Sequence, residues 1–382
     1  MRSIAIAVLL ASAAVAQTVV DPAKLGDVPK ALAPQPGGRP LQCRVMPIKP
    51  ALDFGFRFQA GYVVRVPMSQ YSGPGHKWAM LTRITPEGGG RKPVYLLSGV
   101  RLPPIPRTNL ELEIGGGYLL GEGRYDVSWA MFDDAGRTCR GGWRVDARLG
   151  RRERRVKVAM PRGAVGEFSS RVLPNGKRDS DDAPPLRLTV LLHVAPLVPF
   201  RTRLRASDRV MLLGLLSTLL ERLPARSVRL VVFNLDQQKE LFRQEAFPPE
   251  ALDQVAQSIN GLELGRVDYH VLQNRLGHVD LLAGLVNREL QAEAPSDVVV
   301  FLGPEARYWD KLPEAALEEI HGAEPRFFYL EYKPPYFRPG PNIPDSISSA
   351  VGKLKGKTVV IRSPADLANA IEEIERRAAA PK

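Results

Sequence analysis

Cysteine is scarce in this sequence, with two residues among 382. Two cysteines are too few for a disulfide-dense scaffold or for a zinc site with four cysteine ligands. Apolar runs are short as well. After the first residues none reaches the 18 that a membrane-spanning helix needs, so we expect no integral membrane segment there. The motifs G-x-S-x-G, H-E-x-x-H, Walker A and the dinucleotide-binding glycine pattern are also absent. The sequence therefore points to no recognisable catalytic chemistry and to no cofactor.

The overall composition is that of a globular protein. Hydrophobic residues make up 44% and charged residues 25% of the chain, which is close to ordinary usage. Disorder as the main state is therefore excluded. A chain of this length accommodates about two domains of ~100–200 residues each.

Positive charge is concentrated in the first part of the chain. Residues 161–382 hold 29 Lys and Arg against 29 Asp and Glu, whereas residues 17–160 hold 23 against 12. The densest stretch, which we call the basic patch, consists of Arg144, Arg148, Arg151, Arg152, Arg154, Arg155 and Lys157. Such a patch favours an anionic partner, although the same residues also suit a solvated strand end and linker.

The first 16 residues have the pattern of a secretory signal peptide. Arg2 precedes an apolar run, and Ala14-Val15-Ala16 matches the small-residue cleavage pattern. We expect a mature chain that starts at Gln17 and is secreted or periplasmic; an uncleaved anchor is the alternative. In that location we expect a protein partner and no nucleic acid.

Export also predicts a disulfide between Cys43 and Cys139, because two cysteines in an oxidising compartment tend to pair. The bond would close a long loop and contribute ~4–5 kcal/mol in the chain-entropy model. Two buried free thiols are the alternative.

Residues 17–40 form a Pro-rich leader, and residues 41–160 predict an all-β domain resembling an Ig-like sandwich. Short β-rich runs alternate with Gly, Pro and Asn/Asp clusters. From Tyr125 to Met131 every second residue is large and apolar, which is the period of a half-buried strand. Trp78, Trp129 and Trp143 are expected in the core; a carbohydrate-stacking platform is the alternative.

Residues 161–185 are rich in Pro, Gly, Ser and charge and predict a linker. Residues 186–382 alternate buried strands with helices. This order predicts an α/β domain with a doubly wound, mostly parallel sheet.

This second domain resembles the von Willebrand factor type A family in element order and in four stretches: LTVLLHVAP, SVRLVVFN, GHVDLLAGL and DVVVFLGPEA. In that family the first stretch carries the metal-binding motif D-x-S-x-S. Here its aspartate position falls on His193 and its serines on Ala195 and Leu197. The family's threonine position falls on Val279, and the aspartate of its T-D-G falls near Gly303 or Pro304.

These positions offer neither carboxylate nor hydroxyl oxygen, which Mg²⁺ and Ca²⁺ require. The resemblance therefore implies a degenerate metal site that binds no metal. We expect the surface around His193 to be mostly apolar, without converging carboxylates.

A second candidate site is the loop with Asp268, His270, His278 and Asp280. These residue types suit a transition metal, but we favour a polar loop before a helix, with Asp280 in the first turn, where its charge suits the helix dipole.

The leading functional hypothesis is a secreted, non-enzymatic binding or assembly protein that contacts a protein partner without a metal. One alternative is a binder of acidic envelope polymers through the Arg-rich first domain. The other is a hydrolase with an unrecognised site near His193 or the His270/His278 loop.

Overall fold

The computed structural model describes residues 17–24, 32–33, 39–73, 75–88, 90–104, 106–168, 186–198, 201–248, 251–265, 269–310, 312–318, 324–334 and 343–379. The chain divides into two compact units, Met1–Ser169 and Ser170–Lys382. The predicted signal peptide, residues 1–16, and residues 169–185 of the predicted linker lie outside the described residues.

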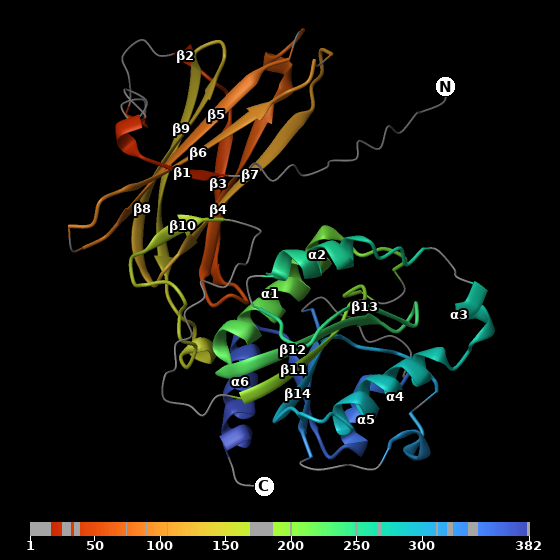
Figure 1. Cartoon of the computed structure of the whole chain (residues 1–382). Coiled ribbons are helices and arrows are strands. Elements are labelled where there is room, and N and C mark those ends of the chain that lie inside the picture. The colour runs from red at the N-terminus through yellow and green to blue at the C-terminus, as the bar shows by residue number, and fades with distance from the viewer. Residues whose placement is uncertain are drawn as a thin grey trace. The chain divides into compact units, whose positions relative to one another are not determined.

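The first unit consists of two β-sheets (Figure 1). The larger has, in spatial order, β1 (Thr18–Val20), β6 (Val94–Arg101), β5 (Lys77–Pro86), β8 (Gly123–Asp133), β9 (Arg137–Ala147) and β2 (Arg39–Pro40). The smaller has β10 (Val165–Glu167), β7 (Glu111–Leu120), β4 (Phe58–Pro67) and β3 (Arg44–Leu52). All neighbours are antiparallel except β2 and β9. Short 3-10 turns lie at Pro22–Lys24, Met68–Gln70 and Arg151–Glu153 (η4).

A core of aromatic and aliphatic side chains is shared by the two sheets. Trp129 of β8 is completely buried, and its ring lies 5.3 Å from that of Tyr62 in β4. Trp78 is buried as well, whereas Trp143 is only half-buried. The period of two predicted for β8 therefore places its large side chains in the core, as expected.

The predicted disulfide is confirmed. Cys43, just before β3, is bonded to Cys139 of β9, and their Cα atoms are 6.1 Å apart.

The first unit extends beyond the predicted bounds of residues 41 and 160. From the predicted leader, β1 pairs with β6 and β2 with β9; from the predicted linker, β10 pairs with β7. The hydroxyl of Tyr125 helps to hold this region, because it lies 2.8 Å from the carbonyl oxygen of Gly121 and 3.1 Å from that of Ala164.

The second unit has one six-stranded sheet. In spatial order it contains β13 (Lys239–Gln244), β12 (Ala225–Asn234), β11 (Leu186–His193), β14 (Val298–Pro304), β15 (Arg326–Tyr332) and β16 (Lys357–Ile361). β13 is antiparallel to β12, and the other pairs are parallel.

The helices of this unit are α1 (Ala206–Arg222), α2 (Leu252–Asn260), α3 (Tyr269–Gln273), α4 (Gly277–Leu290), α5 (Ser346–Lys353) and α6 (Pro364–Ala379). Apolar side chains of α4 and α5 share a buried cluster with alternate residues of β11, β12, β14 and β15. A single 3-10 turn, Glu314–Ala316, lies between β14 and β15 within the described residues. No helix in the described parts of the chain is both long and apolar enough to cross a membrane.

The predicted fold class, a doubly wound mostly parallel α/β domain behind an Ig-like sandwich, is wrong. The described residues are mostly β, with 40% strand and 26% helix, and their three sheets do not form a clearly doubly wound fold. One physical reason is the short connection between β12 and β13. Four residues allow a hairpin turn but not the crossover that a parallel pair needs, so this edge becomes antiparallel and the sheet is mixed.

Candidate functional site

The candidate site is a pocket in the second unit at the carboxyl ends of β11, β12, β14 and β15. Its volume is about 300 Å³. It is lined by residues of the segments that follow these strands, among them His193, Ala195, Leu197, Arg201, Asp236, Glu305, Arg307, Tyr308 and Lys333. The edge where parallel strands end is where such sheets usually bind ligands.

His193, the last residue of β11, is only 2% exposed. Its Nδ1 lies 3.3 Å from the carbonyl oxygen of Pro304. Because a carbonyl oxygen only accepts, Nδ1 carries the proton and Nε2 is a hydrogen-bond acceptor. Nε2 is buried without a partner among the described residues. Burial lowers the pKa of His193, and the negative charge of Asp236 opposes this only in part, which favours a neutral ring.

The backbone of β14 holds this histidine in place. Gly303 has φ +152° and packs directly against His193. The carbonyl oxygen of the next residue, Pro304, accepts from His193 and from the hydroxyl of Tyr329 at 2.9 Å. The ring of Phe233 lies 5.3 Å from the imidazole. The position of His193 is therefore set by three strands of the sheet.

Asp236 brings a negative charge to the pocket, and Tyr308 orients it. The hydroxyl of Tyr308 donates to Oδ1 of Asp236 at 2.5 Å. Burial and the charge of Asp236 both raise the pKa of Tyr308, so its hydroxyl stays protonated. The ring of Tyr308 is stacked on that of His278, with centroids 4.2 Å apart.

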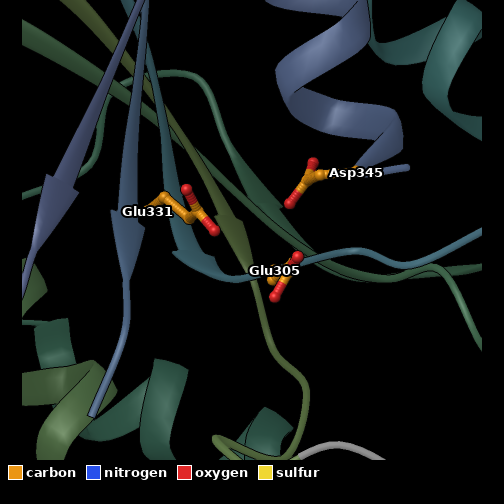
Figure 2. A group of neighbouring side chains, drawn as sticks. All are labelled: Glu305, Glu331 and Asp345. Atoms are coloured by element: carbon orange, nitrogen blue, oxygen red, sulfur yellow. The ribbon is translucent and has the colours of Figure 1, made fainter. Parts of the chain in front are cut away.

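Three carboxylates converge beside the pocket (Figure 2). Glu305 follows β14, Glu331 lies in β15 and Asp345 precedes α5, and one oxygen from each lies within 4.8 Å of the others. Oxygen ligands of this kind suit a hard divalent cation. The expectation of a mostly apolar surface without converging carboxylates is therefore wrong.

Each member of this acidic cluster already has partners. Arg307 pairs with Glu305 at 2.9 Å, and Lys333 pairs with Glu331 at 2.7 Å. Asp345 caps α5, since its carboxylate accepts from the backbone N–H of Ser348 at 2.7 Å. Burial raises the pKa of Glu331 and raises that of Asp345 to about 7. The cluster therefore combines two ion pairs with an aspartate that retains its proton close to neutral pH.

Sequence reasoning missed this cluster because residues 305, 331 and 345 belong to no common motif. The available signal was positional: Glu305 directly follows a predicted strand that ends at the ligand edge. Of the predicted degenerate positions, His193, Ala195 and Leu197 do lie together at the pocket. Val279 does not; it belongs to α4 and is buried in the core of the second unit.

The predicted loop cluster does not come together in the described residues. His278 is buried against Tyr308, whereas Asp280 is exposed and accepts from the side chain of Asn274 at 3.3 Å. Asp268 and the side chain of His270 lie outside the described residues.

The basic patch lies in the first unit on β9 and the segment after it. Arg144 and Arg148 are exposed and pair with Asp126 and Asp146. The remaining residues, Arg151, Arg152, Arg154, Arg155 and Lys157, lie in and after η4 and are exposed too.

Comparisons with known proteins do not identify the chain. No family model and no curated protein matches it. Solved structures similar to it include a Bordetella pertussis protein described as ApaA, at 15% identity and a TM-score of 0.19, covering 30% of this chain and 99% of that one. Another is a Bacteroides uniformis β-glucuronidase, at 9% identity and a TM-score of 0.20, covering 76% of this chain and 36% of that one. The chain thus spans about a third of the glucuronidase. TM-scores this low support neither a fold nor a function, so the resemblance to the von Willebrand factor type A family remains a prediction from the four sequence stretches.

Proposed function

We propose that this protein is a non-enzymatic binding protein that acts outside the cytoplasm and holds a protein partner at the pocket around His193. Two features support the location. The first 16 residues have the composition of a signal peptide, and the Cys43–Cys139 disulfide is typical of exported chains.

The unpartnered Nε2 of His193 is the observation that carries the proposal. A buried acceptor without a partner costs free energy, and a ligand that donates to it recovers that cost. The pocket is large enough to admit a side chain of a partner protein, so we infer that the partner inserts an N–H or O–H group here.

The surroundings of His193 favour binding over catalysis. A catalytic histidine usually has a nucleophile on one side and an orienting carboxylate on the other. Here Nδ1 faces the carbonyl oxygen of Pro304, and Ala195 and Leu197, which line the same pocket, carry no nucleophilic group.

The ion pairs of the acidic cluster favour binding without a metal. A cation held by Glu305 and Glu331 would have to displace Arg307 and Lys333, which already neutralise these carboxylates. This is the basis for proposing direct contact with the partner.

Site-specific photo-crosslinking in the native host tests the proposal. A photoreactive residue at Thr202, on the pocket rim, should form an adduct with one protein, identified by mass spectrometry. The same group at exposed Glu372 of α6 is the control. The purified partner should then bind the wild type at least about 10-fold more tightly than His193→Asn, a difference of about 1.4 kcal/mol.

His193→Asn is the informative variant because its amide N–H can still donate to Pro304 while the Nε2 acceptor is lost. Equal binding by the wild type and His193→Asn would contradict the proposal. So would the same adducts from both crosslinking positions.

A further inference from the structure

A hollow in the first unit gathers arginines that are far apart in the sequence. Its volume is about 460 Å³, and its charged lining consists of Arg91, Arg124, Arg148, Arg162, Glu87 and Glu122. Arg91 precedes β6, Arg124 lies at the start of β8, Arg148 follows β9, and Arg162 precedes β10. The hollow is thus built from four segments, and only Arg148 belongs to the basic patch.

The four guanidinium groups are not neutralised within the hollow. Glu87 lies 3.9 Å from Arg124, at the limit of an ion pair, and Arg148 pairs at 2.7 Å with Asp146, which is not one of the lining residues. Among the described residues, Arg162 and Glu122 form no ion pair that would cancel their charges. Four positive against two negative side chains leave the lining positive, and all four arginines are exposed.

The backbone helps to keep the arginines in place. The guanidinium of Arg91 donates to the carbonyl oxygen of Arg162. It lies over Gly163, whose φ of +71° and missing side chain leave room for it. Arg91 is therefore anchored beside Arg162 and does not simply extend into solvent.

We propose that this hollow is a binding site for an acidic polysaccharide, a second site separate from the pocket around His193. Guanidinium groups bind carboxylates through paired, charge-assisted hydrogen bonds. The two glutamates in the lining accept from sugar hydroxyls. A densely charged polymer without hydroxyl groups, such as polyphosphate, is repelled by the same glutamates.

Binding of the full mature chain to polygalacturonate, measured at low and high salt, tests the site. Arg148→Gln/Arg162→Gln removes two charges from the hollow. Arg151→Gln/Arg152→Gln removes two charges from η4 and is the matched control. We expect about a 10-fold loss of affinity for the first pair and less than about 3-fold for the second. Equal losses, or no binding at low salt, would overturn the proposal.

A specificity readout keeps the test independent of folding. Glu122→Gln should shift the ratio of affinities toward polyphosphate by at least about 3-fold, because one repelling charge is removed. Glu111→Gln, at the other end of β7, should leave the ratio unchanged. Wild-type protein that binds polyphosphate as tightly as polygalacturonate, at equal charge and salt, would show general polyanion binding and refute the site.

Discussion

Gly303 lies so close to His193 that a Cβ at position 303 would be 2.4 Å from the carbonyl oxygen of His193. The glycine also has φ +152°, which other residues rarely adopt. Contact and backbone conformation therefore both exclude a side chain at this point of β14.

Gly303→Ala should destabilise the second unit by about 2–4 kcal/mol, because backbone strain and a steric clash act together. The control is Gly284→Ala in the interior of α4, where nothing lies within 4 Å of the new Cβ. That change should stabilise by about 0.5–1 kcal/mol. Urea unfolding measures both, and equal effects would contradict this account.

His193→Ala should lower the free energy of unfolding by about 2–4 kcal/mol, because removing a buried ring that lies against Phe233 leaves a cavity. The sequence alone does not show this burial, which follows from the packing of β11 between its neighbouring strands. His193→Asn should cost less, since the bond to Pro304 is kept. Thermal unfolding of the two variants checks this order; a smaller loss for alanine would be inconsistent with it.

Asp345 should give stability an unusual pH dependence. Its folded-state pKa, about 7, lies above the ordinary 3.8, so the native state binds the proton more tightly than the unfolded state. The contribution of Asp345 to the free energy of unfolding is fully present below about pH 4. It is lost as pH rises to 7, by at most about 1.4 kcal/mol per pH unit.

Asp345→Asn isolates this effect, because asparagine still caps α5 but does not titrate. Between pH 4 and 7 the stability of the wild type, measured relative to the variant, should fall as pH rises. Urea unfolding at several pH values provides the data. Parallel curves would rule out a raised pKa at Asp345.

Removing the disulfide should destabilise the first unit. The bond spans 96 positions in sequence, so the chain-entropy model predicts a loss of ~4–5 kcal/mol in Cys43→Ala/Cys139→Ala. Thiol labelling of the unfolded, non-reduced wild type should find no free thiol. Two labelled cysteines would show that the bond is absent in the exported protein.

Mg²⁺, Ca²⁺ or Mn²⁺ at millimolar concentration should not raise the melting temperature, because Arg307 and Lys333 occupy the acidic cluster. A ligand that binds only the native state must stabilise it. Arg307→Gln/Lys333→Gln removes both cations and should make the melting temperature metal-sensitive. A rise of several degrees in the wild type, reversed by a chelator, would mean that the cluster binds metal.

Local patterns in the sequence determined the elements whose cause is local. The period of two from Tyr125 to Met131 predicted β8, and the alternation of strand and helix patterns after residue 186 predicted that the second unit contains both. The disulfide was predictable too, because only two cysteines exist to pair. The interactions that decide these strands and helices lie between residues close together in the sequence, and the two cysteines allow one intramolecular disulfide.

Tertiary structure alone decided the sites. Glu305, Glu331 and Asp345 meet because β14 and β15 are neighbours in the sheet and α5 begins beside them. The arginine hollow depends in the same way on four segments that meet in space, whereas the sequence drew attention to arginines that are close together along the chain. β13 is antiparallel to β12 because only a short turn joins the two strands. Nε2 of His193 is an acceptor only because the carbonyl oxygen of Pro304 fixes the proton on Nδ1. Strand order and side-chain proximity are not encoded in local periodicity, so these relationships could not be derived before the fold was known.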